Sequence, residues 1–252
     1  KLTGKMDITS RVAEFVDCRS KETGQRELFI VEGKSALGSV KQARDPNFQA
    51  VMPIRGKILN CLKVDYDKIF KNEIIMDLIK VLGCGVQVKS KANKSVGAFD
   101  INALRWNKVI LCTDADVDGF HIRTMLLTML YRLTPDLISQ NKVFIAESPL
   151  YEINSKDKTY FAYNEREKDQ FLQELEGQKY TIQRSKGLGE NDPDMMNLTT
   201  MNPKTRRLIQ VNPGDVERAA EMFDVLLGDN LTGRKDYIAQ HGSEYLDDLD
   251  VS

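Results

Sequence analysis

The sequence has few of the residues that build disulfide frameworks or zinc knuckles. Its 252 residues include four cysteines and two histidines, and no Cys-x-x-Cys pair occurs. Neither a disulfide scaffold nor a zinc knuckle is therefore indicated. Cys61, Cys84 and Cys112 stand in apolar runs, which predicts reduced thiols in the core of a cytoplasmic protein.

The chain also lacks an excess of either charge and any long hydrophobic run. Its 36 basic and 37 acidic residues leave a net charge of −1, so nucleic acid could be bound only through local basic patches. The apolar stretch "MLLTMLYRL" is too short to span a membrane, and no signal peptide is visible. Because the chain starts with Lys1 and not with methionine, we expect it to be part of a longer protein.

Apolar strand patterns alternate with helical patterns over roughly the first 150 residues. This alternation predicts an α/β fold in which a parallel sheet carries helices on both faces. Expected strands cover residues 27–33, 48–54 (stopped by Pro53), 108–113 and 142–151, and expected helices cover 35–44, 66–83 (closed by Gly83) and 121–138.

The pattern becomes mixed beyond residue 150. A strand at 180–184 is expected to run into a Gly-rich turn, and residues 202–211 and 215–228 have helical spacing. The predicted organisation is a linker at 1–25, an α/β domain at 26–150 and a mixed α/β tail at 151–252 packed on that domain.

Acidic residues follow two of the expected strands. Glu32 ends "LFIVE", and "VILCTDADVDGFHIR" places Asp114, Asp116 and Asp118 directly after a buried run. In open parallel sheets, sites form at the carboxyl ends of the strands. We therefore expect the functional site at this edge of the sheet.

Three interpretations of the aspartates compete. A calcium EF-hand loop would need glutamate at its twelfth position, where this chain has Met125. Helix capping explains one aspartate, for which Asp118 is the candidate, but not three. The third interpretation is a Mg²⁺ site, in which Asp114 and Asp116 share the cation and Glu32 joins them. A divalent cation would offset the mutual repulsion of these carboxylates, so we favour this interpretation.

A phosphate-binding loop is not present at "VEGKSALGS". Gly33-Lys34-Ser35 resembles the end of such a loop, but the pattern requires glycine five residues before the Gly-Lys pair, where Leu28 stands. The glycine turn could still receive a phosphate or cap a helix.

Four motifs together resemble a known family. In chain order they are "VEGKSALGSVKQARD", "QAVMPIRGKILN", "TDADVDGFHIRT" and "RSKGLGEND". They are similar to the TOPRIM region and tail of the B subunits of type IIA topoisomerases, of either the gyrase or the topoisomerase IV kind. The resemblance implies a Rossmann-like TOPRIM fold and a part in ATP-dependent cleavage and religation of double-stranded DNA.

The resemblance also implies partners and location. The nucleophilic tyrosine belongs to an A-type subunit of an A2B2 complex, and ATP is bound only by a domain that precedes this region. No membrane is involved, and the protein is expected in the bacterial cytoplasm with the nucleoid. Lys34 departs from the family, which usually has Asp or Asn after Glu-Gly.

Roles for individual residues follow from the same motifs. The resemblance implies that Glu32, Asp114 and Asp116 are catalytic and, with Asp118, bind one or two Mg²⁺ ions. It places Arg55, Lys57 and Lys186 near the cleaved DNA. His121 fits either a phosphate contact or a solvated helix start.

Two other functions share parts of this pattern. A standalone TOPRIM nuclease or primase would have the acids but not the "RGK" and "KGLGE" motifs. A phosphoaspartate receiver or phosphatase would also place aspartate at strand ends, and formation of an aspartyl phosphate would identify it.

Overall fold

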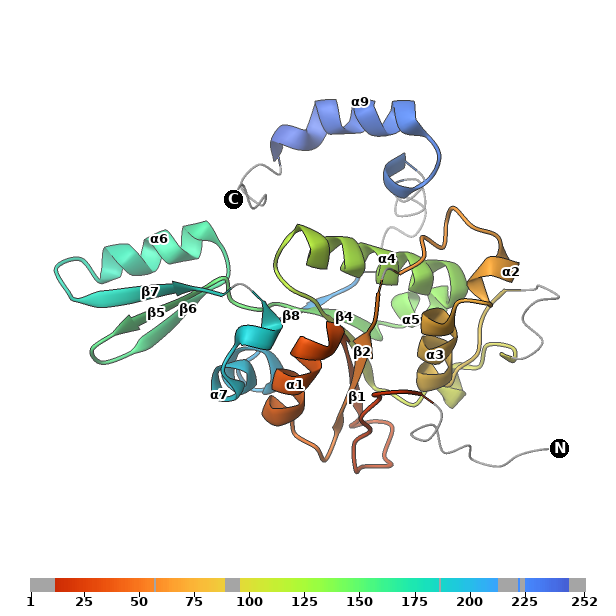
Figure 1. Cartoon of the computed structure of the whole chain (residues 1–252), viewed down its shortest axis with the longest axis horizontal. Helices are drawn as coiled ribbons and strands as arrows, with labels where there is room; N and C mark the ends of the chain where they lie inside the picture. The colour runs from red at the N-terminus through yellow and green to blue at the C-terminus, as the bar shows by residue number, and fades with distance from the viewer. Residues whose placement is uncertain are drawn as a thin grey trace.

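The computed structural model describes residues 12–56, 58–88, 96–185, 187–212, 222 and 225–244. Two sheets are present in these parts of the chain (Figure 1). The larger sheet has five strands in the order β2-β1-β3-β4-β8, and the smaller has the order β6-β5-β7. The predicted α/β class with a Rossmann-like parallel sheet is confirmed.

The first four strands of the larger sheet run parallel to one another. The chain returns through helices between them, as parallel neighbours require. In sheet order the strands are β2 (Gln49–Ile54), β1 (Glu27–Glu32), β3 (Lys108–Cys112) and β4 (Val143–Ala146). Pro53 does not stop β2 but lies within it, which a strand at the sheet edge tolerates.

Alternate side chains of each strand enter two separate cores. In β1, Leu28 and Ile30 pack in one core, whereas Phe29 and Val31 pack in the other. Strand β3 repeats this alternation with Leu111 and Cys112. Because successive side chains of a strand point to opposite faces, both faces of the sheet are covered.

Different elements cover the two faces. Helices α3 (Glu73–Leu82), α4 (Val117–Leu133) and α5 (Pro135–Ser139) contribute to the first core. Helix α1 (Gly33–Ala43) contributes to the second. Residues from the C-terminal region join α1 there, so this region completes one layer of the domain; they are Leu188, Met196 and Met201.

Two of the expected long helices are interrupted. Residues 66–83 form α2 (Tyr66–Ile69) and α3, because Asn72 accepts a hydrogen bond from the backbone N–H of Ile75 and starts a new helix. Gly83 ends α3 with a φ of 80°, as predicted. The other helix begins earlier than expected and divides before Pro135 into α4 and α5.

The C-terminal region contains an antiparallel sheet and short helices. A three-residue strand in it, β8 (Leu208–Gln210), pairs antiparallel with β4, so the helix predicted for 202–211 is wrong. Most of the helix predicted for 215–228 lies outside the described residues. The other elements of this region are β5 (Tyr151–Ser155), β6 (Thr159–Ala162), α6 (Glu165–Glu174), β7 (Tyr180–Arg184), η3 (Leu188–Glu190), α7 (Pro193–Met196), η4 (Asn197–Met201) and α9 (Leu231–His241). Earlier in the chain, a short 3₁₀ helix, η2 (Ile101–Ala103), precedes β3.

The stretch expected as a linker is partly packed on the domain. Val12, Phe15 and Cys18 are buried in the first core, and Val16 bridges to Val51 at the open edge of β2. All four cysteines are buried and free, as predicted for Cys61, Cys84 and Cys112. None of the helices in the described parts of the chain combines the length and apolar character needed to cross a bilayer.

Candidate metal centre and nucleic-acid interface

Glu32 and Asp114 meet at the carboxyl end of the parallel sheet. Glu32 is the last residue of β1, and Asp114 follows the neighbouring strand β3, whose Cys112 is level with Val31. The backbone N–H of Asp114 donates a hydrogen bond to Glu32 Oε2 at 3.3 Å. The expected edge of the sheet therefore does bring these two acids together.

The surroundings of Glu32 and Asp114 disfavour the charged form of each carboxyl group. Burial raises the pKa of Glu32 above its ordinary value, and the negative charge of Asp114 raises it further. Burial likewise raises the pKa of Asp114, with a smaller contribution from Asp116 and an opposing hydrogen bond from Leu188. Among the described residues, no basic side chain forms an ion pair with either group. Such a pair of half-buried acids favours a cation between or beside them.

Asp116 and Asp118 stand at the start of α4. Asp116, and not Asp118, is the capping residue: its Oδ1 accepts a hydrogen bond from the backbone N–H of Gly119 at 2.7 Å. Asp118 is exposed in the first helical turn. The loop is tight, because a Cβ on Gly119 would lie 2.0 Å from the carbonyl oxygen of Asp114. Only glycine fits such a close backbone approach.

The described side chains do not form a closed metal cage. No three acidic, histidine or cysteine groups among them are arranged to hold a metal ion by themselves. Mg²⁺ does not need such a cage, since it binds through one or two carboxylates and keeps water or phosphate oxygens elsewhere. Carboxylate oxygens and uncompensated negative charge match this cation, so the residues present fit an open Mg²⁺ site.

The predicted basic residues have different surroundings. Arg55 follows β2 and forms an ion pair with Glu14, which also pairs with Lys34 at 2.9 Å. A hydrogen bond from Lys34 and the charge of Arg55 hold the pKa of Glu14 below its ordinary value. His121 is exposed in α4. Lys57 and Lys186 lie outside the described residues.

Two contacts at the site were missed by the sequence reasoning. Glu14 offsets the charge that Lys34 introduces, and no short-range pattern relates residues so far apart in the chain. The backbone N–H of Leu188 donates to Asp114 Oδ1 at 2.8 Å across 74 positions. The only sequence signal for this second contact was the "KGLGE" motif, from which a role was predicted for the side chain of Lys186 and not for a backbone N–H.

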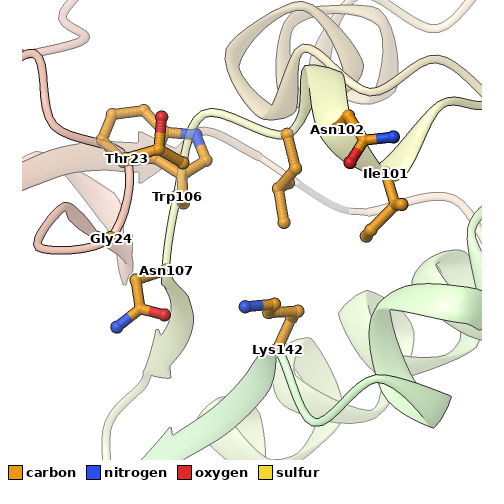
Figure 2. A pocket seen from close by; sticks show the side chains of 8 residues that line it. Thr23, Gly24, Ile101, Asn102, Trp106, Asn107 and Lys142 are labelled. Atoms are coloured by element: carbon orange, nitrogen blue, oxygen red, sulfur yellow. The ribbon is translucent and has the colours of Figure 1, made fainter.

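A cavity elsewhere on the domain does not include the acids. Figure 2 shows Trp106, Asn107 and Lys142 around it. Asn107 directly precedes β3 and Lys142 lies just before β4, so the cavity is at the amino ends of these strands. The Trp106 indole donates its hydrogen bond to the carbonyl oxygen of Val81 at 2.8 Å, which gives this residue a structural role.

The parallel strands β1–β4 and the acids at their carboxyl ends lie in one stretch that belongs to the Toprim class. The family model described as "Toprim domain" matches residues 27–148. A second, described as "DNA gyrase B subunit, carboxyl terminus", matches residues 177–239.

Comparison with individual proteins shows which Toprim proteins the chain is similar to. The chain is 43% identical to the DNA gyrase B subunit from Thermotoga maritima over 96% of its length, and 43% identical to that from Clostridium acetobutylicum over 98%. The one from Archaeoglobus fulgidus is 43% identical over 97% of the chain. The chain therefore carries a Toprim domain and is similar to DNA gyrase B subunits over nearly its whole length. It spans 37% of the length of each of these relatives.

Proposed function

We propose that this chain is the Mg²⁺-binding and DNA-binding part of an ATP-dependent type IIA topoisomerase, acting with a gyrase A-type subunit in an A2B2 complex. It would assist cleavage and religation of double-stranded DNA by the tyrosine of the A subunit, in the bacterial cytoplasm. Residues 26–150 would form the Toprim domain, residues 151–252 the C-terminal region and residues 1–25 the connection before them. The similarity to DNA gyrase B subunits supports this proposal, and the contact between Glu32 and Asp114 is the observation that carries it.

The acids have distinct roles in the proposal. Asp114 and Asp116 would bind Mg²⁺ with Glu32, and Asp118 would add negative charge beside them. The cation, one or two per site, would stabilise charge on the phosphate oxygens and on the leaving 3′ oxygen. Glu32 would act as a general acid and base, since it is half-buried and lies at the edge of the sheet where a phosphate would approach.

Basic residues would hold the duplex by its phosphates. Arg55, Lys57, His121 and Lys186 are the proposed contacts, and such contacts are largely independent of sequence and sensitive to salt. Arg55 is paired with Glu14 in the free chain, so DNA would compete with that carboxylate for the guanidinium group.

Reconstitution tests this function. The full-length subunit that carries this chain would be mixed with candidate A subunits, duplex DNA and ATP, with and without Mg²⁺. We expect DNA cleavage only when both subunits and Mg²⁺ are present, and the balance of supercoiling against decatenation would assign the gyrase or topoisomerase IV type. Metal-dependent nicking by the purified chain alone would contradict the proposal and favour a standalone nuclease.

A further inference from the structure

A turn of the C-terminal region lies directly on the acidic site. The turn consists of Gly187 followed by η3, and its Leu188 N–H donates to Oδ1 of Asp114 at 2.8 Å. Among the described residues, this is the one hydrogen bond that the Asp114 carboxylate accepts. The second oxygen, Oδ2, accepts none from them, so the protein orients one oxygen and leaves the lone pairs of the other unused.

The turn is held in place from its far side. Leu188 is buried in the second core together with residues of β1 and α1. The Ser39 hydroxyl donates to the carbonyl oxygen of Gly189 at 3.1 Å, and the Ser185 hydroxyl bonds to Asn191 at 2.7 Å. The N–H of Leu188 is therefore fixed relative to the sheet, as a group that orients a carboxylate must be.

The turn lies so close to its neighbours that a side chain at either of its glycines would meet another residue. A Cβ on Gly187 would lie 3.0 Å from Asp114 Oδ2, and one on Gly189 would lie 2.6 Å from the Cβ of Ser35. Gly187 has a φ of −166°, which is extended backbone that any residue adopts. A Cβ at Gly187 would therefore press on the Asp114 carboxylate and shift it, whereas the backbone conformation there accepts any residue.

We propose that the Gly187–Gly189 turn is a positioning element that orients the Asp114 carboxylate for its cation, so that the C-terminal region sets the metal affinity of the Toprim domain. The inference rests on the proposed metal function of Asp114. Residues that orient a metal ligand typically change affinity about 10- to 100-fold when altered.

The test measures metal binding and folding separately. Mn²⁺ replaces Mg²⁺ as the probe, its binding to the full chain is followed by the EPR signal of free Mn²⁺, and thermal unfolding is recorded without metal. Gly187→Ala is expected to raise the Mn²⁺ dissociation constant about 10-fold with little change in melting temperature. The matched control is Gly24→Ala, because a Cβ there meets nothing within 4 Å, and it should bind as the parent does.

A second variant and a double-mutant cycle complete the design. Ser39→Ala removes the hydroxyl that holds Gly189 and should weaken Mn²⁺ binding in the same direction by a smaller factor. Adding Gly187→Ala to Asp114→Ala should have no further effect, because the two act through one carboxylate. Parent-like affinity in both Gly187→Ala and Ser39→Ala would overturn the inference. If Asp114→Ala itself binds Mn²⁺ like the parent, the proposed metal function fails instead.

Discussion

Replacing Asp114 by alanine is expected to reduce Mg²⁺-dependent DNA cleavage by the reconstituted complex by about 10³-fold or more. Metal ions supply several kcal/mol of transition-state stabilisation, and about 4 kcal/mol corresponds to this factor in rate. Asp114 is expected to matter most of the three aspartates because it contacts both Glu32 and the C-terminal turn. The measurement is the initial rate of double-strand cleavage at saturating Mg²⁺.

Asp67→Ala is the matched control for this experiment. Asp67 is an exposed aspartate in the first turn of α2, on a helix that does not carry the acidic site. Its loss should leave the cleavage rate within about twofold of the parent, since surface substitutions usually change little. Normal cleavage by Asp114→Ala would remove the basis of the proposed function.

Replacing Arg206 by methionine is expected to lower the free energy of unfolding by about 3–5 kcal/mol. Arg206 donates two hydrogen bonds of 2.6 Å to the two oxygens of Glu27, and both side chains are 4% exposed. The substitution would leave a buried carboxylate whose remaining polar partners, among the residues that the structure describes, are Gln49 and Lys108. Chemical denaturation followed by far-UV circular dichroism measures the loss.

The neighbouring residue supplies the control. Arg207 pairs with Glu167 at the surface, so Arg207→Met should cost about 1 kcal/mol or less. The double variant Glu27→Gln/Arg206→Met should recover much of the stability lost by Arg206→Met, because no buried charge remains. Equal losses for the Arg206 and Arg207 variants would contradict the account of this pair.

The same pair predicts how stability depends on pH. Burial alone would raise the pKa of Glu27, but the hydrogen bonds and charge of Arg206, together with smaller contributions from Gln49 and Lys108, leave the pKa below its ordinary value of 4.5. The unfolded chain therefore binds this proton more readily than the folded chain. The stabilisation is present above about pH 4.5 and is lost as the pH falls through the lower, folded value. Arg206→Met should raise the folded-state pKa of Glu27 and so reduce that dependence.

The sheet and its acidic edge could be predicted because they depend on short-range patterns. Buried runs at 27–32 and 108–112 have the length and composition of strands, and parallel neighbours place Glu32 and Asp114 at one edge. Strand β8 could not be predicted in this way, since it has three residues and exists through its pairing with β4. Asp118 was the candidate for the helix cap, but the capping residue is Asp116, since helix starts predicted from sequence are uncertain by a residue or two.

Contacts between residues that are far apart in the chain could not be predicted from the sequence. Arg206 lies in a stretch that was predicted only as a helix, yet its side chain is buried against Glu27, 179 positions away. Leu188 was expected only as part of a Gly-rich turn, yet its N–H donates a hydrogen bond to Asp114. In both cases the C-terminal region binds back onto the first domain, and no local pattern carries that information.

The most direct test of the central claim is an anomalous difference map from crystals of this chain soaked in Mn²⁺. We expect a peak at coordination distance, about 2.0–2.3 Å, from carboxylate oxygens of Asp114 and Asp116, with Glu32 beside it. A saturating soak that gives its strongest peak away from these residues, or none near them, would contradict the claim that this edge of the sheet binds a divalent cation.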